Sequence, residues 1–306
     1  MVPDGAFSTV ESPNPEDPAG FAMALELAKA NDAEIIIGTD PDADRVGAMA
    51  LHEGEYRFIS GNQMGVLLLG YLIYGKNAAG RMPDNAAFIQ SIVTTEMSID
   101  LAKAAGLATY KTFTGFKFMA EKTAALEGSK TVIFCYEESY GYMAGDFVRD
   151  KDAVTASMLI AEMAAWYQTR DMTLIDGIEE HFRNLGCFYE ERTLNMVMPG
   201  YDGLKKMQAL MDGLRAAPPR EIGGQAVVTL RDYQSDKSIT DGVETDMELS
   251  GSNVLEFTLA DGTAFIVRPS GTEPKVKVYI LAKGKDRAGC EETVRRCEAF
   301  AEGLAA

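Results

Sequence analysis

The chain has 306 residues with 46 acidic and 29 basic side chains, and its formal net charge of −17 argues against a nucleic acid or an anionic membrane as a partner. The hydrophobic share of 46% and the charged share of 25% are typical of globular proteins and exclude a globally disordered chain. No apolar run reaches the roughly 18 residues of a membrane span, and the four cysteines lack metal-binding spacing, which predicts a cytoplasmic protein with reduced thiols.

Predicted helices and strands alternate in the first part of the chain. Residues 21–29 have the apolar spacing of a helix, and the β-branched run at 34–38 predicts a buried parallel strand that ends at an acidic loop. A second strand is predicted at 46–51 and a helix at 61–74. The stretch at 75–85 is rich in glycine, proline and asparagine and marks the first domain boundary.

The alternation continues beyond this boundary and implies βαβ units around a largely parallel sheet. A loop at 136–150 separates the last of these strands from two long helical segments. The predicted strands are 87–93, 108–111 and 131–135, and the predicted helices are 96–105, 116–126, 151–168 and 173–184.

From residue 188 the pattern changes to short strands joined by tight turns such as Asp261-Gly262, which is typical of antiparallel pairing. We therefore predict an α/β fold with two mixed, mainly parallel sheet units, the first incomplete, followed by an α+β C-terminal domain with an antiparallel sheet. The predicted domains are 1–80, 81–187 and 188–306; in the last, strands are predicted at 192–198, 226–230, 254–259, 263–267 and 275–282, and helices at 203–214 and 286–304.

Three aspartates follow the first predicted strand in the sequence GTDPDADRVG. Asp40, Asp42 and Asp44 stand at alternate positions of a turn, where their carboxylates can converge on one hard cation. An EF-hand loop is excluded because Arg45 and Leu51 stand where that loop needs a glycine and a bidentate glutamate. The pattern therefore predicts a metal site, and an acidic solvated turn is the alternative.

A second candidate loop, RPSGTEP, joins two predicted strands near the C-terminus. Arg268 offers a bidentate fork, Ser270 and Thr272 offer hydroxyl groups, and Gly271 permits close approach of the backbone. Such a loop can hold a phosphate. A hairpin turn that contains proline and glycine by chance is an equally good interpretation of this loop alone.

Two further loops follow predicted strands. In CYEESYG, the paired carboxylates of Glu137 and Glu138, together with Ser139, can accept and donate hydrogen bonds to vicinal sugar hydroxyls, although spacing alone favours a solvated acidic turn. In TFTGFK, Thr114, Gly115 and Lys117 stand at a strand-to-helix turn. This turn suits an anionic or hydroxylated ligand, or serves only as a helix cap.

Taken in this order, the four loops resemble those of the α-D-phosphohexomutase superfamily, which comprises phosphoglucomutases and phosphomannomutases. DPDADR resembles the magnesium loop of this family, TFTGFK and CYEESYG its sugar-recognition segments, and RPSGTEP its phosphate-binding loop. The resemblance extends over nearly the whole chain, and the phrases VESPNPEDP and FVRDKDAV resemble the phosphoglucomutase/phosphopentomutase branch.

The resemblance implies an intramolecular phosphotransferase that converts a hexose 1-phosphate into a hexose 6-phosphate. A phosphoserine donates its phosphoryl group, and the resulting bisphosphate, glucose 1,6-bisphosphate for glucose, returns its other phosphate to the serine. The resemblance also implies Mg²⁺ on the three aspartates and Arg45 against the phosphoryl oxygens. The implied sugar-phosphate-binding residues are Thr114, Gly115, Lys117, Glu137, Ser139, Lys151, Arg268, Ser270, Gly271 and Thr272.

The sequence departs from the family at the nucleophile. The family's serine lies in a Ser-His-Asn-Pro context, and neither histidine of this chain follows a serine. The first residues resemble the middle of the family's second domain, so we expect a C-terminal portion that is inactive alone and that self-associates through apolar surface at the cut edge. Two alternatives stay open: a non-catalytic sugar-phosphate-binding fragment, and a Mg²⁺-dependent sugar phosphatase with an aspartate nucleophile.

Overall fold

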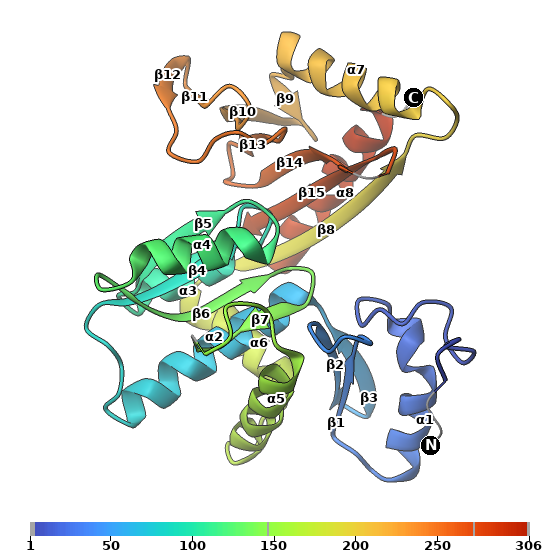
Figure 1. Cartoon of the computed structure of the whole chain (residues 1–306), viewed down its shortest axis with the longest axis vertical. Helices are drawn as coiled ribbons and strands as arrows, with labels where there is room; N and C mark the ends of the chain where they lie inside the picture. Colours follow the sequence, from blue (N-terminus) through green and yellow to red (C-terminus); the bar gives the residue numbers. More distant parts are fainter. Residues whose placement is uncertain (1–3, 146, 272, 305–306) are drawn as a thin grey trace. The chain divides into compact units, whose positions relative to one another are not determined.

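The computed structural model describes residues 4–145, 147–271 and 273–304. Two compact units, Met1–Leu185 and Gly186–Ala306, make up the chain and run from blue to yellow-green and from yellow to red in Figure 1. In the described part of the chain, no helix combines the length and the apolar character needed to cross a membrane.

The first unit begins with a small antiparallel sheet of β1 (Ile35–Thr39), β2 (Val46–His52) and β3 (Glu55–Ile59), in that order. The 3₁₀-helix η1 (Pro18–Phe21) and helix α1 (Ala22–Ala30) lie beside this sheet (Figure 1). Apolar side chains of η1, α1, β1 and β2 form one buried cluster, which fixes the sheet against the helix.

The direction of one predicted strand is wrong. Residues 34–38 were expected to form a parallel strand, but β1 pairs antiparallel with β2, and Ile37 lies opposite Ala48. A parallel pair needs a crossover of about a dozen residues or more. Because the loop between β1 and β2 comprises only residues 40–45, the chain forms a hairpin instead.

The second sheet has the order β5-β4-β6-β7, and it confirms the mixed, mainly parallel arrangement. Strand β4 (Ala86–Ser91) pairs parallel with β5 (Ala108–Thr112) and with β6 (Thr131–Glu137), whereas β7 (Gly141–Met143) is antiparallel to β6. The helices of this part are α2 (Gly61–Ala78), α3 (Glu96–Ala104), α4 (Phe116–Leu126), α5 (Ala153–Gln168) and α6 (Leu174–Leu185).

Helix α2 packs closely against β6, the strand that leads into the CYEESYG loop. The helix begins at a capping box, in which Ser60 Oγ accepts from the backbone of Gln63 and the Gln63 side chain accepts from the backbone of Ser60. A Cβ atom on Gly65 would lie 2.1 Å from the ring of Tyr136. The glycine therefore lets this aromatic ring lie directly against the helix.

The second unit is an α+β domain with an antiparallel sheet, as predicted. Its sheet has the order β12-β11-β10-β13-β14-β15-β8, with β9 paired to β10. Alternate residues of β14 and β15 enter a buried core that they share with α8. The elements are β8 (Phe188–Val197), α7 (Gly203–Ala216), β9 (Glu221–Ile222), β10 (Gln225–Asp232), β11 (Lys237–Thr240), β12 (Val243–Asp246), β13 (Leu255–Leu259), β14 (Ala264–Pro269), β15 (Lys275–Gly284) and α8 (Arg287–Leu304).

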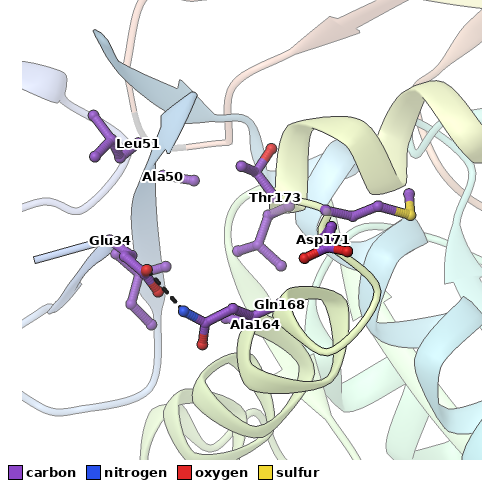
Figure 2. Close-up of a pocket in the computed structure, with 10 residues that line it drawn as sticks. Glu34, Ala50, Leu51, Ala164, Gln168, Asp171 and Thr173 are labelled. Carbon is purple, nitrogen blue, oxygen red and sulfur yellow. Dashed lines mark hydrogen bonds between the residues drawn. The ribbon is translucent and has the colours of Figure 1, made fainter. Parts of the chain in front are cut away.

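A hollow of about 280 Å³ lies between the β1–β2 hairpin and helices α5 and α6. Figure 2 shows Glu34 and Gln168 joined across it by a hydrogen bond of 2.8 Å. Nearby, Nδ1 of His52 lies 3.0 Å from Oγ1 of Thr173. These contacts hold the end of the hairpin that is remote from its acidic loop.

Candidate active site

The three aspartates lie in the six-residue loop between β1 and β2. Oδ1 of Asp40 accepts hydrogen bonds from the backbone N–H groups of Asp44 and Arg45, at 3.0 and 2.9 Å, which folds the loop back on itself. Ala43 adopts a left-handed conformation, with φ of 54°, at the reversal. One carboxylate oxygen each of Asp40, Asp42 and Asp44 lies within 4.8 Å of the others. The structure therefore brings the three predicted metal ligands together.

Two cationic side chains neighbour these carboxylates. Nζ of Lys151 lies 2.6 Å from Oδ2 of Asp44, and Nε of Arg45 lies 3.8 Å from Oδ1 of the same residue. Nη1 of Arg45 also donates to Glu16 at 3.2 Å. Burial alone would raise the pKa of Asp44, but the Lys151 hydrogen bond and the two positive charges lower that pKa below its usual value. Asp44 is thereby kept ionised, the form that binds a cation.

The donor set suits a hard divalent cation such as Mg²⁺. Oδ1 of Asp44 is buried and accepts no hydrogen bond from the described residues. A buried carboxylate oxygen without a donor is unfavourable, and a cation bound to the three carboxylates would satisfy it. Burial raises the pKa of Asp40 above its usual value, and the neighbouring Asp44 carboxyl adds to this effect. A bound cation would offset both the burial of Asp40 and its repulsion by the Asp44 carboxyl.

The acidic loop and the strand after it are joined by backbone contacts to the last two residues of CYEESYG. The backbone N–H of Val46 donates to the carbonyl of Tyr140 at 3.1 Å, and Arg45 forms a β-bridge with Gly141. Tyr140 has a left-handed φ of 67°, so the CYEESYG loop turns sharply at this contact. The predicted metal loop and the predicted sugar loop are therefore parts of one backbone network.

A second set of contacts places Lys151 beside the carboxylates. The backbone N–H of Ala153 donates to the carbonyl of Ala43 at 3.0 Å, which docks the start of α5 on the acidic loop. A Cβ atom on Gly141 would lie 2.8 Å from Cδ of Lys151. The lysine stem therefore uses the space left by this glycine to reach Asp44.

The two predicted sugar-recognition segments meet through a carboxylate. Glu137 is 7% exposed at the end of β6, and its Oε1 accepts from the backbone N–H of Gly115 at the start of α4. Gly115 has φ of 112°, a conformation that requires glycine. Thr114 and Ser139 are half-buried on these same two loops. Four of the predicted binding residues are thus gathered at the carboxyl ends of β5 and β6, the two strands that flank β4 in the sheet.

Lys117 is placed differently from the other predicted binding residues. Its side chain is exposed, and its Nζ lies 4.8 Å from the centre of the Phe118 ring. Within the described residues, no hydrogen bond or ion pair joins this lysine to the carboxylates of the site. Its predicted contact with a sugar phosphate stays a prediction.

In the second unit, the RPSGTEP loop connects β14 and β15. Oγ of Ser270 accepts from the backbone N–H of Glu273 at 3.2 Å, and the backbone N–H of Ser270 donates to Lys275 at 2.8 Å. Gly271 is exposed, and a Cβ atom there would meet nothing within 4 Å. Thr272 lies outside the described residues. The described part of the loop is a tight connection with an accessible backbone.

Arg268 stands directly opposite Lys277 across the β14–β15 pair. Opposed side chains of an antiparallel pair lie on one face, where like charges repel each other. Neither side chain makes an ion pair or hydrogen bond with the described residues, so an anion on this face would relieve the repulsion. Sequence reasoning missed Lys277, although the alternation KVKV after the loop places every second residue on this face.

Sequence comparison assigns the chain to a family. Models of three domains of the phosphoglucomutase/phosphomannomutase family match it: the α/β/α domain II at residues 1–53, the α/β/α domain III at 60–185 and the C-terminal domain at 211–293. The chain belongs to the phosphoglucomutase/phosphomannomutase family. Its homologues are α-D-phosphohexomutases, and the family's phosphoserine domain is not among the matched domains.

Several curated phosphoglucomutases are similar in sequence to this chain. The phosphoglucomutase of Staphylococcus aureus strain USA300 is 38% identical over 285 residues, which cover 92% of this chain and 50% of the relative. The phosphoglucomutase of strain MRSA252 is 38% identical over 292 residues, which cover 93% and 51%. The chain thus spans about half the length of the curated relatives it matches.

Solved structures support the fold of this phosphohexomutase-family chain. A putative phosphomannomutase from Thermus thermophilus has a TM-score of 0.62 at 17% identity, over 95% of this chain and 51% of its own. A phosphoglucomutase/phosphomannomutase family protein from Burkholderia thailandensis has a TM-score of 0.61 at 16% identity, over 96% and 52%. The mixed α/β arrangement with a C-terminal antiparallel sheet is therefore the fold of this family.

Proposed function

We propose that this chain carries the metal-binding, sugar-binding and phosphate-binding parts of a hexose phosphate mutase, and that its 306 residues lack the nucleophilic serine needed for turnover. The observation that carries the proposal is the convergence of Asp40, Asp42 and Asp44, with Arg45 and Lys151 beside them. Membership of the phosphoglucomutase/phosphomannomutase family supports the same reaction class.

The chemistry of phosphoryl transfer fits these residues. Such transfer depends on positioning and on charge neutralisation more than on covalent chemistry by the protein. Bound Mg²⁺ would be held by the three aspartates and would neutralise charge on the phosphoryl oxygens. The guanidinium of Arg45 would hold those oxygens, while Glu137 and Ser139 would orient the sugar through its hydroxyl groups.

The loop of the second unit would bind the phosphate that is not transferred. Arg268 would provide the bidentate hydrogen bonds, and Ser270, Gly271 and Thr272 would complete the loop. Lys277 adds a second positive charge opposite Arg268, in a chain whose formal net charge is −17. A local cationic face of this kind favours a phosphate group over a neutral sugar.

The proposal is tested by incubating the chain with glucose 1-phosphate, glucose 1,6-bisphosphate and Mg²⁺. We expect no glucose 6-phosphate from the chain alone, together with a higher melting temperature when the sugar phosphate is present. Addition of a polypeptide that carries the family's phosphoserine domain is expected to start isomerisation.

The other outcomes point to the alternatives. Robust turnover by the chain alone would refute the proposed lack of a nucleophile. Release of inorganic phosphate would favour a Mg²⁺-dependent sugar phosphatase, in which an aspartate forms an acyl phosphate. Stabilisation by glucose 1-phosphate with no isomerisation, even after the phosphoserine domain is added, would favour a non-catalytic sugar-phosphate-binding fragment.

A further inference from the structure

The loop between β6 and β7 is pressed against the start of helix α2. A Cβ atom on Gly61 would lie 1.9 Å from the backbone oxygen of Glu138 and 3.1 Å from the nitrogen of Tyr140. The hydroxyl of Tyr142 also donates to the carbonyl of Gly61 at 3.1 Å. This loop backbone is therefore held close to the helix, at a place where a glycine permits it.

The side chain of Glu138 extends to a neighbouring strand end. Its Oε2 lies 3.1 Å from Oγ of Ser91 and 3.4 Å from Oγ1 of Thr94. Both hydroxyl residues are fully buried, and their oxygens lie 2.8 Å apart. Ser91 ends β4, and β4 is the parallel neighbour of β6. One carboxylate thus connects the loop after β6 to the loop after β4.

The two consecutive glutamates have different partners. Glu137 accepts from Gly115, on the loop after β5, whereas Glu138 accepts from Ser91, the last residue of β4, and from Thr94 on the loop after it. Together they fix the same short turn to both neighbouring loops. Hydrogen bonds to an ionised acceptor are stronger than hydrogen bonds between neutral groups. The bond from Ser91 to Glu138 is also formed by a fully buried hydroxyl, where solvent weakens it little.

We propose that Glu138 is a positioning residue, which fixes the loop so that Glu137 and Ser139 present their polar atoms to the sugar. This inference rests on the proposed function, because it assigns the sugar hydroxyls to Glu137 and Ser139. Glu138 acts through the loop backbone, and it orders the loop before a ligand arrives. Without the Glu138 carboxylate the loop must be ordered when the sugar binds, which raises the entropic cost of binding.

The test compares Glu138→Ala with Glu138→Gln, since the amide oxygen of glutamine still accepts from a hydroxyl. The affinity for glucose 1-phosphate is expected to fall about tenfold in Glu138→Ala and to remain within about threefold in Glu138→Gln. Affinities for inorganic phosphate and for Mn²⁺ are expected to be unchanged in both variants. An unchanged glucose 1-phosphate affinity in Glu138→Ala overturns the proposal.

A double-mutant cycle with Ser91→Ala identifies the route of the effect. If Glu138 acts through Ser91, then Ser91→Ala costs little further affinity in the Glu138→Ala background. If the affinity losses of Glu138→Ala and Ser91→Ala multiply in the double variant, the proposal is overturned. Glu138→Ala and Ser91→Ala both retain the aspartates and Glu137, so a variant that has lost its fold is recognised by its loss of Mn²⁺ binding. If Glu138→Ala loses its fold, the affinity of Glu138→Gln for glucose 1-phosphate is compared with that of the unmodified chain instead.

Hydrogen exchange provides a readout that needs no sugar ligand. The backbone N–H groups of Gly115 and Val46, which donate to Glu137 and to Tyr140, are expected to exchange about tenfold faster in Glu138→Ala. Unchanged exchange there overturns the positioning role. If the unmodified chain fails to bind glucose 1-phosphate, the proposed function fails, while these exchange rates still decide whether Glu138 orders the loop.

Discussion

Nζ of Lys151 lies 2.6 Å from Oδ2 of Asp44, so a cation from the chain itself already neutralises part of the aspartate cluster. Burial would lower the pKa of Lys151, but its hydrogen bonds and charge contacts with Asp44 and Asp150 raise that pKa above its usual value. The lysine is therefore protonated throughout the neutral range. It competes with a divalent cation for the same carboxylate.

This competition predicts tighter metal binding by Lys151→Met. The change removes the competing charge and leaves Oδ2 of Asp44 free, so the affinity for Mn²⁺ is expected to rise about fivefold, equivalent to ~1 kcal/mol. Titration calorimetry with Mn²⁺ measures it. Arg149→Met is the matched control, because the Arg149 side chain pairs with Glu127 instead. Equal affinities in Lys151→Met and the unmodified chain would contradict the competition.

Separate binding places for metal and phosphate predict that two substitutions weaken the binding of different ligands. Arg268→Ala is expected to weaken glucose 1-phosphate binding by about 1.5–3 kcal/mol, the range of hydrogen bonds to charged groups. Asp42→Asn is expected to weaken Mg²⁺ binding and leave sugar-phosphate affinity largely intact. Lys205→Ala, which removes an exposed cation of α7, controls for net charge. If Arg268→Ala and Asp42→Asn reduce sugar-phosphate affinity equally, the assignment of separate places is wrong.

The strand ends that carry the site were predictable from the sequence. Asp40 and Glu137 follow runs of β-branched and apolar residues. In the structure β1 ends at Thr39, directly before Asp40, and β6 ends at Glu137. The other helices and strands through residue 185 were also predicted in the right order, apart from the short strands β3 and β7, because buried strands and amphipathic helices leave clear apolar patterns. Local patterns therefore located the loops that carry the polar groups.

The contacts that join those loops left no such pattern. The hydrogen bonds from Val46 to Tyr140 and from Ala153 to Ala43 are made by backbone atoms, which every residue type supplies. Strand β7 has only three residues and lay within a predicted loop. Strands β11 and β12 are largely exposed, so they lack the alternation of a half-buried strand and were not predicted. Tertiary pairing, rather than local preference, forms these elements.

Two glycines of helix α2 predict opposite changes in stability. A Cβ on Gly61 would lie 1.9 Å from the backbone oxygen of Glu138, so Gly61→Ala is expected to destabilise the fold by roughly 1–3 kcal/mol and to displace the loop. A Cβ on Gly75 would meet nothing within 4 Å, so Gly75→Ala is expected to stabilise the helix by roughly 0.5–1 kcal/mol. Urea denaturation measures both. The same sign of change in the two variants would contradict the close approach at Gly61.

A buried histidine predicts that acid destabilises the first unit. His181 on α6 is 8% exposed, its Nε2 has no hydrogen-bond partner among the described residues, and a Cβ on Gly70 would lie 2.5 Å from its ring. Burial lowers the pKa of His181 below its usual value, and the charge of Arg170 lowers it further while that of Glu180 partly offsets the effect. As the pH falls below about 6.5, the unfolded chain gains a proton at this position that the folded chain does not, so the free energy of unfolding falls until the folded pKa is reached.

The melting temperature is therefore expected to drop between about pH 7.5 and about pH 5.5, and His181→Gln, which cannot take up the proton, is expected to show a smaller drop. An equal drop in both proteins would place the acid sensitivity elsewhere in the chain.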